Sequence, residues 1–284
     1  GGGYSNLTYE VCTEKEVFIV RKPPKGAEKI KGGHDMAREF RVLKALQNAS
    51  FSFIPSPIAL CEDREMMGTP FYVMKKVEGI IFRADQVTYL QENEGMVPFK
   101  EMSFALCDAL VALHAVNIQE TGLIELGKPD GYVSRQVEGW TKRYLAAQTS
   151  SISTFDFVSH WLLEHIPISG APTLIHNDFK YDNVVFADLN SARVKAILDW
   201  EMTTVGDPLM DVGTTLSYWS EEGDGAFEKS FNLTWLPGNC ARAEFVERYA
   251  QKSGRSVENI LFYYVFGLFK NAVVIQQIYA RYQA

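Results

Sequence analysis

Short stretches in which apolar and polar side chains alternate come first along the chain. Residues 8–12 and 17–21 alternate in this way on either side of a polar turn at residues 13–16. Because the side chains of a strand point alternately to the two faces of a sheet, this pattern predicts a β-hairpin. Helical periodicity dominates the later part of the chain.

Apolar residues recur at helical spacing in two segments. The clearer one covers residues 98–117, where Pro98 suits the first turn and the apolar stripe consists of Met102, Leu106, Leu110, Leu113 and Val116. An earlier helix is predicted after Asp35, a suitable N-cap, with an apolar face made of Met36, Phe40 and Leu43. We expect packing or capping roles for the helical histidines, which are His114, His160 and His165.

Length and composition predict a soluble protein in the cytoplasm. With 284 residues, 46% of them hydrophobic, the chain can form one sizeable core or two smaller ones in contact. The net charge of −7 disfavours nucleic acid and anionic membranes as partners. The most apolar stretch, residues 261–278, predicts a core helix because polar residues and a glycine interrupt it. The four cysteines are widely spaced, which favours reduced thiols over a zinc site or disulfides.

Two neighbouring segments carry the candidate chemistry. The first reads His176-Asn-Asp178-Phe-Lys180-Tyr-Asp-Asn183, and the second begins at Asp199 after the apolar run 194–198. A plain turn is the alternative interpretation, since Asp and Asn favour turns. The β-rich runs that flank both segments disfavour it.

The first segment matches the catalytic loop of protein kinases, and Asp199 stands where those enzymes keep the aspartate of Asp-Phe-Gly. The resemblance implies that Asp178 accepts the proton of the attacking hydroxyl and that Asn183 and Asp199 bind Mg²⁺. It further implies that Lys180 neutralises charge on the moving phosphoryl group, while His176 anchors the loop. Here the tripeptide is Asp-Trp-Glu, so no flexible glycine switch is expected.

The residues after Asp199 resemble the aminoglycoside phosphotransferase and choline kinase superfamily through the run Gly206-Asp207-Pro208-Leu-Met-Asp211. This resemblance implies an α+β, protein-kinase-like fold. Residues 1–78 would form a small nucleotide-binding lobe with an antiparallel sheet and one helix, and residues 79–284 a larger, mostly helical lobe. It also implies ATP and Mg²⁺ as cofactors and a small-molecule hydroxyl as the acceptor. Asp211 would brace the catalytic loop, and Asp207 is expected to cap a helix.

The resemblance extends to the N-terminal lobe. Residues 2–9 are similar to the loop that covers the nucleotide phosphates, which assigns Ser5 and Asn6 to the cofactor, although the strand that precedes this loop in the family is absent. Residues 71–79 resemble the last strand and the hinge that faces adenine, which adds Met74, Lys75 and Val77.

A cation of the N-terminal lobe is expected to hold the phosphates. Arg21 and Lys22 end the same strand, so their side chains must point to opposite faces. The resemblance assigns the phosphates to Arg21, with Glu39 as its partner, and Lys22 is the alternative. A solvated helix face is the other interpretation of Arg38, Glu39 and Arg41.

One subgroup is especially similar, namely kinase-like proteins of bacteria and the kinase-like domain fused to acyl-CoA dehydrogenases. A dehydrogenase domain would need several hundred further residues. By association we expect a hydroxy-acid or hydroxyacyl acceptor, for which Arg135 and Lys142 are candidate cations. An aminoglycoside or choline-type amine would instead suit the acidic and aromatic residues 217–224. A nucleotide-binding pseudokinase or scaffold is disfavoured because the base and metal residues are present.

Overall fold

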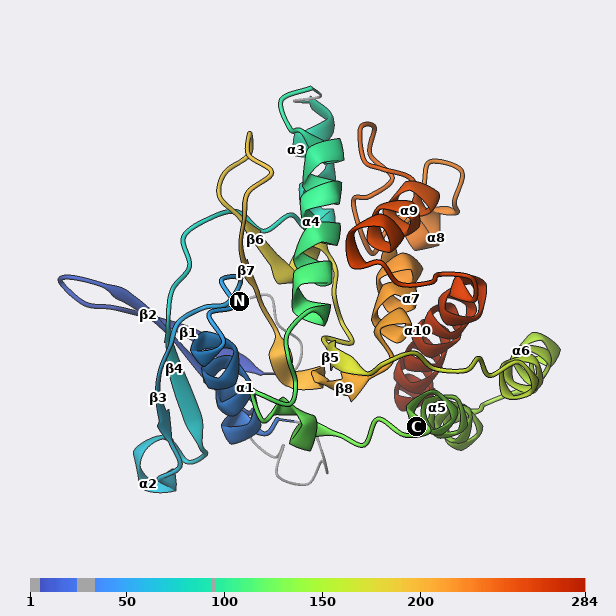
Figure 1. Cartoon of the computed structure of the whole chain (residues 1–284), viewed down its shortest axis with the longest axis horizontal. Helices are drawn as coiled ribbons and strands as arrows, with labels where there is room; N and C mark the ends of the chain where they lie inside the picture. The colour runs from blue at the N-terminus through green and yellow to red at the C-terminus, as the bar shows by residue number, and fades with distance from the viewer. Residues whose placement is uncertain (1–5, 25–33, 93–94, 284) are drawn as a thin grey trace.

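The computed structural model describes residues 6–24, 34–92 and 95–283. Its first part is a four-stranded antiparallel sheet with the strand order β1-β2-β4-β3, where the strands are Leu7–Cys12, Val17–Lys22, Pro57–Cys61 and Phe71–Lys75. The predicted hairpin is confirmed, because Thr8 pairs with Arg21 and Cys12 with Val17. Helix α1 (Met36–Asn48) lies against this sheet (Figure 1).

Helices dominate the chain after residue 76, and short strands lie between them. The long helices are α4 (Phe99–His114), α5 (Tyr132–Ala147), α6 (Ser153–Glu164), α7 (Pro208–Tyr218), α9 (Arg242–Ser253) and α10 (Ile260–Gln283). Shorter turns of helix are α2 (Arg64–Met67), η2 (Ala84–Gln86), α3 (Val87–Glu92), η3 (Leu123–Leu126), η4 (Tyr181–Asn183), η5 (Trp200–Met202) and α8 (Ala226–Lys229). The predicted α+β organisation is confirmed.

Two small antiparallel ladders hold the candidate catalytic segments. Strand β5 (Thr173–Ile175) pairs with β8 (Thr204–Gly206), and β6 (Val184–Phe186) pairs with β7 (Val194–Ile197). The segment that begins at His176 therefore connects the two ladders, and so does the segment that begins at Asp199. This arrangement brings both segments to the same end of the ladders.

The predicted helix caps are present. Asp35 accepts a hydrogen bond from the Arg38 amide at 2.9 Å, and Asp207 accepts one from the Leu209 amide at 2.9 Å ahead of Pro208. Both carboxylates satisfy amides that have no partner within the first helical turn.

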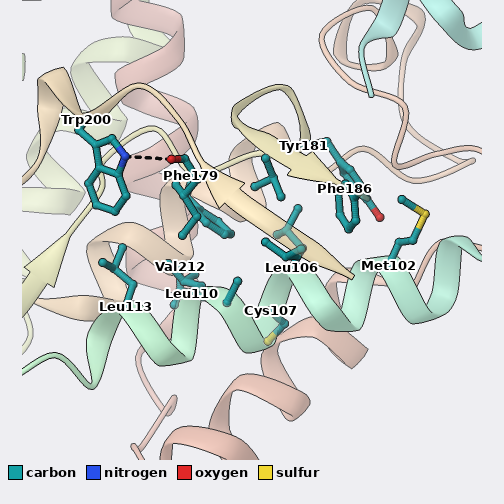
Figure 2. Close-up of a cluster of buried hydrophobic side chains, with 14 of the residues drawn as sticks. Met102, Leu106, Cys107, Leu110, Leu113, Phe179, Tyr181, Phe186, Trp200 and Val212 are labelled. Atoms are coloured by element: carbon teal, nitrogen blue, oxygen red, sulfur yellow. Dashed lines mark hydrogen bonds between the residues drawn. The ribbon is translucent and has the colours of Figure 1, made fainter. Parts of the chain in front are cut away.

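The stripe predicted on α4 faces the main hydrophobic core. Met102, Leu106, Leu110 and Leu113 are buried, and Figure 2 shows them facing Phe179, Tyr181, Phe186, Trp200 and Val212. The same cluster includes Val42, Leu43 and Tyr72 from the sheet and α1, so the core is continuous between the two parts of the chain. A second cluster joins α5, α6 and α10.

The apolar stretch predicted as a core helix forms the N-terminal part of α10, which packs against α7, α5 and α6. Within the described residues α10 is also the one helix that is long and apolar enough, by length and composition alone, to cross a membrane. Its last turns expose apolar side chains, among them Ile278, Tyr279 and Tyr282.

Candidate active site

A buried carboxylate holds the loop between β5 and η4 through backbone hydrogen bonds. Asp211, on α7, accepts hydrogen bonds from the backbone amides of His176 at 2.5 Å and Asn177 at 2.7 Å. His114 contributes a third contact at 3.2 Å. Burial by itself would raise the pKa of Asp211, but its interactions with His114 and His176 hold it below the usual value. Asp211 is therefore an anionic anchor for the loop.

The His176 side chain connects the loop to the end of strand β7 through two hydrogen bonds. Its Nδ1 accepts from the Asp178 amide at 3.3 Å, so Nε2 carries the proton and donates to the Leu198 carbonyl at 2.9 Å. The ring is fully buried between Phe179 and Trp200. This position connects the loop to the residue before Asp199 and leaves no ring nitrogen for proton transfer.

Cationic and polar side chains surround the carboxylate of Asp178. Lys180 Nζ lies 3.2 Å from Oδ1, and Asn183 Nδ2 donates to Oδ2 at 2.9 Å. Burial, and after it the charge of this carboxylate, raises the pKa of Tyr218, and the Lys180 ammonium lies 4.5 Å from the centre of the Tyr218 ring. Lys180 and Asp178 are each about one-fifth exposed, so the carboxylate is accessible.

Asp199 lies beside Asn183 because the two segments are hydrogen-bonded. The Leu198 amide donates to the Asn183 carbonyl at 2.7 Å. Asp199 has a left-handed backbone conformation with φ 66°, which turns the chain out of β7. The Asn183 amide nitrogen also donates to the Asp178 carbonyl at 2.8 Å, so the amide oxygen of Asn183 faces away from this loop.

Arg21 connects the sheet to this site. Its Nη2 donates to Asp199 Oδ1 at 2.9 Å, and its Nε lies 3.5 Å from Glu39 Oε2. Lys22 points to the other face, where it donates to the Met67 carbonyl at 2.6 Å. The strand geometry thus directs Arg21, and not Lys22, towards Asp199.

Glu39 is the centre of a buried hydrogen-bond network. It accepts from the Tyr72 hydroxyl at 2.9 Å and from Asn6 Nδ2 at 3.1 Å, and it is 1% exposed. Burial raises the pKa of Glu39 to about 7, although Arg21 and Tyr72 act against this shift. Asn6 also donates to Glu201 at 2.8 Å, so the network reaches the segment after Asp199.

Arg38 attaches helix α1 to that same segment through hydrogen bonds to the carbonyls of Glu201 and Thr203. The interpretation of this helix face as solvated is therefore wrong for Arg38 and Glu39. It holds for Arg41, which is exposed and donates to the Ala37 carbonyl of its own helix.

The remaining residues assigned to the nucleotide lie at the end of β4. Met74 is buried in the sheet, and the Lys75 side chain forms an outer ion pair with Glu16 at 2.6 Å. Among the described residues neither backbone polar group of Val77 has a hydrogen-bond partner. Ser5 lies outside the described residues.

The residues suggested for acceptor binding do not converge on Asp178. Arg135 hydrogen-bonds to the carbonyls of Lys128 and Asp130 in its own loop, and Lys142 is exposed. The acidic segment is partly neutralised, since Arg242 forms ion pairs with both Glu221 and Asp224.

Sequence reasoning missed two residues that contact the loop 176–183. Tyr218 lies within the segment 217–224 that the sequence suggests as an acidic and aromatic wall, and Lys270 is one of the polar residues that interrupt the apolar stretch 261–278. Lys270 is 6% exposed, and its Nζ donates to the Asn177 carbonyl at 2.8 Å. A lysine inside a helix predicted to belong to the core was the available signal, because a buried charge needs a partner.

The chain combines a small antiparallel sheet with a largely helical part that follows it. This fold is the one of kinase-like proteins. The sequence profile described as the phosphotransferase enzyme family matches residues 1–246. The chain belongs to this family.

Proteins named as acyl-CoA dehydrogenase family members are similar to almost the whole of this chain. The chain is 35% identical to acyl-CoA dehydrogenase family member 10 of Mus musculus over 283 residues, which are 98% of this chain and 26% of that protein. It is 34% identical to family member 11 of Homo sapiens over 285 residues, covering 99% of this chain and 35% of that protein. The chain therefore spans about a quarter to a third of these relatives, and the predicted subgroup is confirmed.

Solved structures support the same fold. A crystal structure from Ralstonia eutropha JMP134, provisionally named an aminoglycoside phosphotransferase, is 31% identical and has a TM-score of 0.81, covering 99% of this chain and 82% of that one. The GDP complex of aminoglycoside 2'-phosphotransferase-IIIa is 18% identical with a TM-score of 0.65, covering 100% and 86%. The second likeness concerns the fold alone, and the predicted kinase-like fold is confirmed.

Proposed function

We propose that this protein is an ATP-dependent kinase that transfers the γ-phosphoryl group to a hydroxyl of a small molecule. The observation that carries the proposal is the accessible carboxylate of Asp178 between Lys180 at 3.2 Å and Asn183 at 2.9 Å, with Asp199 attached alongside. A general base, a cation and two oxygen ligands are the groups that phosphoryl transfer requires.

Asp178 orients the acceptor hydroxyl and takes its proton as the new bond between oxygen and phosphorus forms. The bond between the γ-phosphorus and the bridging oxygen breaks, and ADP leaves with that oxygen. Lys180 neutralises charge on the transferred group, since its ammonium lies beside the base. His176 contributes by holding the loop and does not transfer protons.

The Asn183 amide oxygen and the Asp199 carboxylate fit a magnesium ion. They are hard oxygen donors, which Mg²⁺ prefers, and the hydrogen bond from Leu198 to Asn183 holds the two residues next to each other. When bound, Mg²⁺ would neutralise the nucleotide phosphates and align them.

Arg21 and the loop at Asn6 are proposed to hold the phosphates, with Glu39 as the anchor of Arg21. Arg21 Nη2 donates to Asp199 Oδ1 at 2.9 Å, so the guanidinium lies beside the proposed magnesium ligand, where the phosphates would bind. Ser5 shares the Asn6 loop by sequence. The hinge at Met74, Lys75 and Val77 is proposed to face adenine, because the backbone groups of Val77 have no partner among the described residues.

The acceptor is proposed to be a hydroxy-acid or hydroxyacyl metabolite. Two features support an anionic acceptor over a cationic one. Lys180 places positive charge at the base, while the acidic residues Glu221 and Asp224 are occupied by Arg242. The similarity to proteins named as acyl-CoA dehydrogenase family members adds an association.

The test is Mg²⁺-dependent ATP turnover against a panel of hydroxy-acids, their CoA esters, choline and aminoglycosides, with Asp178→Asn as the matched inactive variant. We expect turnover that a hydroxy-acid or hydroxyacyl ester stimulates and that Asp178→Asn abolishes. Nucleotide binding without turnover on any acceptor would favour a pseudokinase. Phosphorylation of aminoglycosides alone would refute the acceptor assignment.

A further inference from the structure

Asn177 precedes the proposed base in a backbone conformation that is unfavourable for a residue with a side chain. Its φ is 67°, in the left-handed region. Three contacts hold the residue besides Lys270. Asp211 accepts from its amide at 2.7 Å, Met202 O accepts from its side-chain amide at 3.0 Å, and the Tyr132 hydroxyl donates to its side-chain oxygen at 3.3 Å.

Lys270 binds the one remaining polar group of Asn177, the backbone carbonyl, at 2.8 Å. This carbonyl belongs to the peptide bond that continues into Asp178. Asp211 therefore accepts from the backbone amide of Asn177, and Lys270 donates to the backbone carbonyl of the same residue. We call this pair the loop clamp.

A close crossing of α7 and α10 brings the clamp together. A Cβ on Gly213 would lie 2.2 Å from the Tyr263 carbonyl oxygen, and one on Gly267 would lie 2.5 Å from the Gly213 carbonyl oxygen. Asp211 comes two residues before Gly213, and Lys270 comes three residues after Gly267. The absence of side chains at this crossing thus lets both charged residues reach the same loop.

A charge at position 270 needs a reason other than packing. The ammonium is buried 5.9 Å from the centre of the Trp140 ring, and burial lowers the pKa of Lys270 while Asp178 and Asp211 act against this shift. A methionine would occupy similar space without the cost of burying a charge. The lysine is explained by the hydrogen bond that it donates to the loop.

We propose that Lys270 is a positioning residue, which fixes the Asn177–Asp178 peptide and thereby the direction of the Asp178 carboxylate. The inference rests on the proposed kinase function. Its consequence is that helix α10 sets the geometry of the base without contacting ATP.

The experiment compares Lys270→Met with two controls on the same helix in the full chain. Val273→Ala removes buried packing one turn away, and Arg281→Met removes an exposed charge. Mg²⁺-dependent ATP hydrolysis, with water as the acceptor, gives kcat and KM. We expect Lys270→Met to lower kcat by roughly 10- to 100-fold with KM for ATP within about twofold, since a displaced base affects the chemical step alone.

Amide hydrogen exchange of residues 174–183 tests the clamp independently of turnover. Lys270→Met should speed exchange in this loop by about tenfold or more relative to Val273→Ala. Lys270→Gln, which keeps an uncharged donor, serves as a second variant if Lys270→Met does not fold, and the same changes in smaller degree are expected.

Three results would overturn the inference: wild-type kcat and loop exchange in the Lys270 variants, equal changes in Val273→Ala, or a raised KM with kcat unchanged. A wild-type protein that fails to turn over ATP would instead refute the kinase proposal. In that case the exchange data would still decide whether Lys270 holds the loop.

Discussion

Removing the side chain of Arg21 tests its proposed role in holding the nucleotide phosphates. Arg21→Ala deletes a guanidinium whose Nη2 lies 2.9 Å from Asp199 Oδ1 and whose Nε lies 3.5 Å from Glu39 Oε2. Arg21 is 9% exposed. Lys22→Ala is the matched control, because the neighbouring cation points away and donates to the Met67 carbonyl. The two variants remove equal charge from adjacent positions of one strand.

The expected magnitude follows from the contacts. A hydrogen bond between charged groups contributes about 1.5–3 kcal/mol, so loss of the proposed contact between Arg21 and phosphate should weaken Mg·ATP binding by roughly 10- to 150-fold. Breaking a buried ion pair costs about 3–5 kcal/mol of folding stability when the remaining charge stays buried. Glu39, whose pKa is about 7, can instead take up a proton at neutral pH, which limits that loss.

The assay is calorimetric titration of a non-hydrolysable ATP analogue with Mg²⁺, alongside urea unfolding at pH 7 and 8.5. Arg21→Ala should bind much more weakly than Lys22→Ala, and its loss of stability should grow with pH as Glu39 becomes harder to protonate. Weaker binding in Lys22→Ala than in Arg21→Ala would refute the assignment of Arg21 to the phosphates.

Three other predictions concern the carboxylates. Asp178→Asn should reduce turnover by about 10²–10⁴-fold and leave ATP affinity unchanged, because the base contacts the acceptor; near-normal turnover would remove it from that role. Asp199→Ala should abolish the Mg²⁺ dependence of nucleotide titrations, and a wild-type dependence would contradict its assignment as a ligand. Folded Glu39 (pKa about 7) binds its proton more tightly than an unfolded glutamate (about 4.3) does, so it contributes stability below pH 4.3 that is lost as the pH rises through 7. Unfolding free energies at pH 4 to 8 should show a decline that Glu39→Gln lacks, and equal slopes in both proteins would count against the buried network.

Several contacts hold the segment after Asp199. Trp200 is buried and donates from Nε1 to the Ile197 carbonyl at 2.9 Å. Arg38 binds the carbonyls of Glu201 and Thr203, which attaches helix α1 to the same segment. Because Glu39 lies on α1 as well, these contacts oppose any displacement of α1 that would separate Glu39 from Arg21.

The sequence by itself determined the features that depend on local spacing. The alternation at residues 8–21 specified the hairpin, Asp35 and Asp207 specified two helix starts, and the α4 stripe specified the core face, since each depends on neighbours within a few positions. The motif from His176 to Asn183 identified the loop for the same reason.

Only the tertiary structure decided which distant groups meet. The strand alone left Arg21 and Lys22 as alternatives, and the choice depended on where the sheet faces Asp199. Lys270, 93 residues from Asn177 in sequence, reaches the loop only because two glycines let α7 and α10 cross closely. Long-range contacts of this kind arise from the packing of whole elements, whereas spacing along the chain records only contacts within one element.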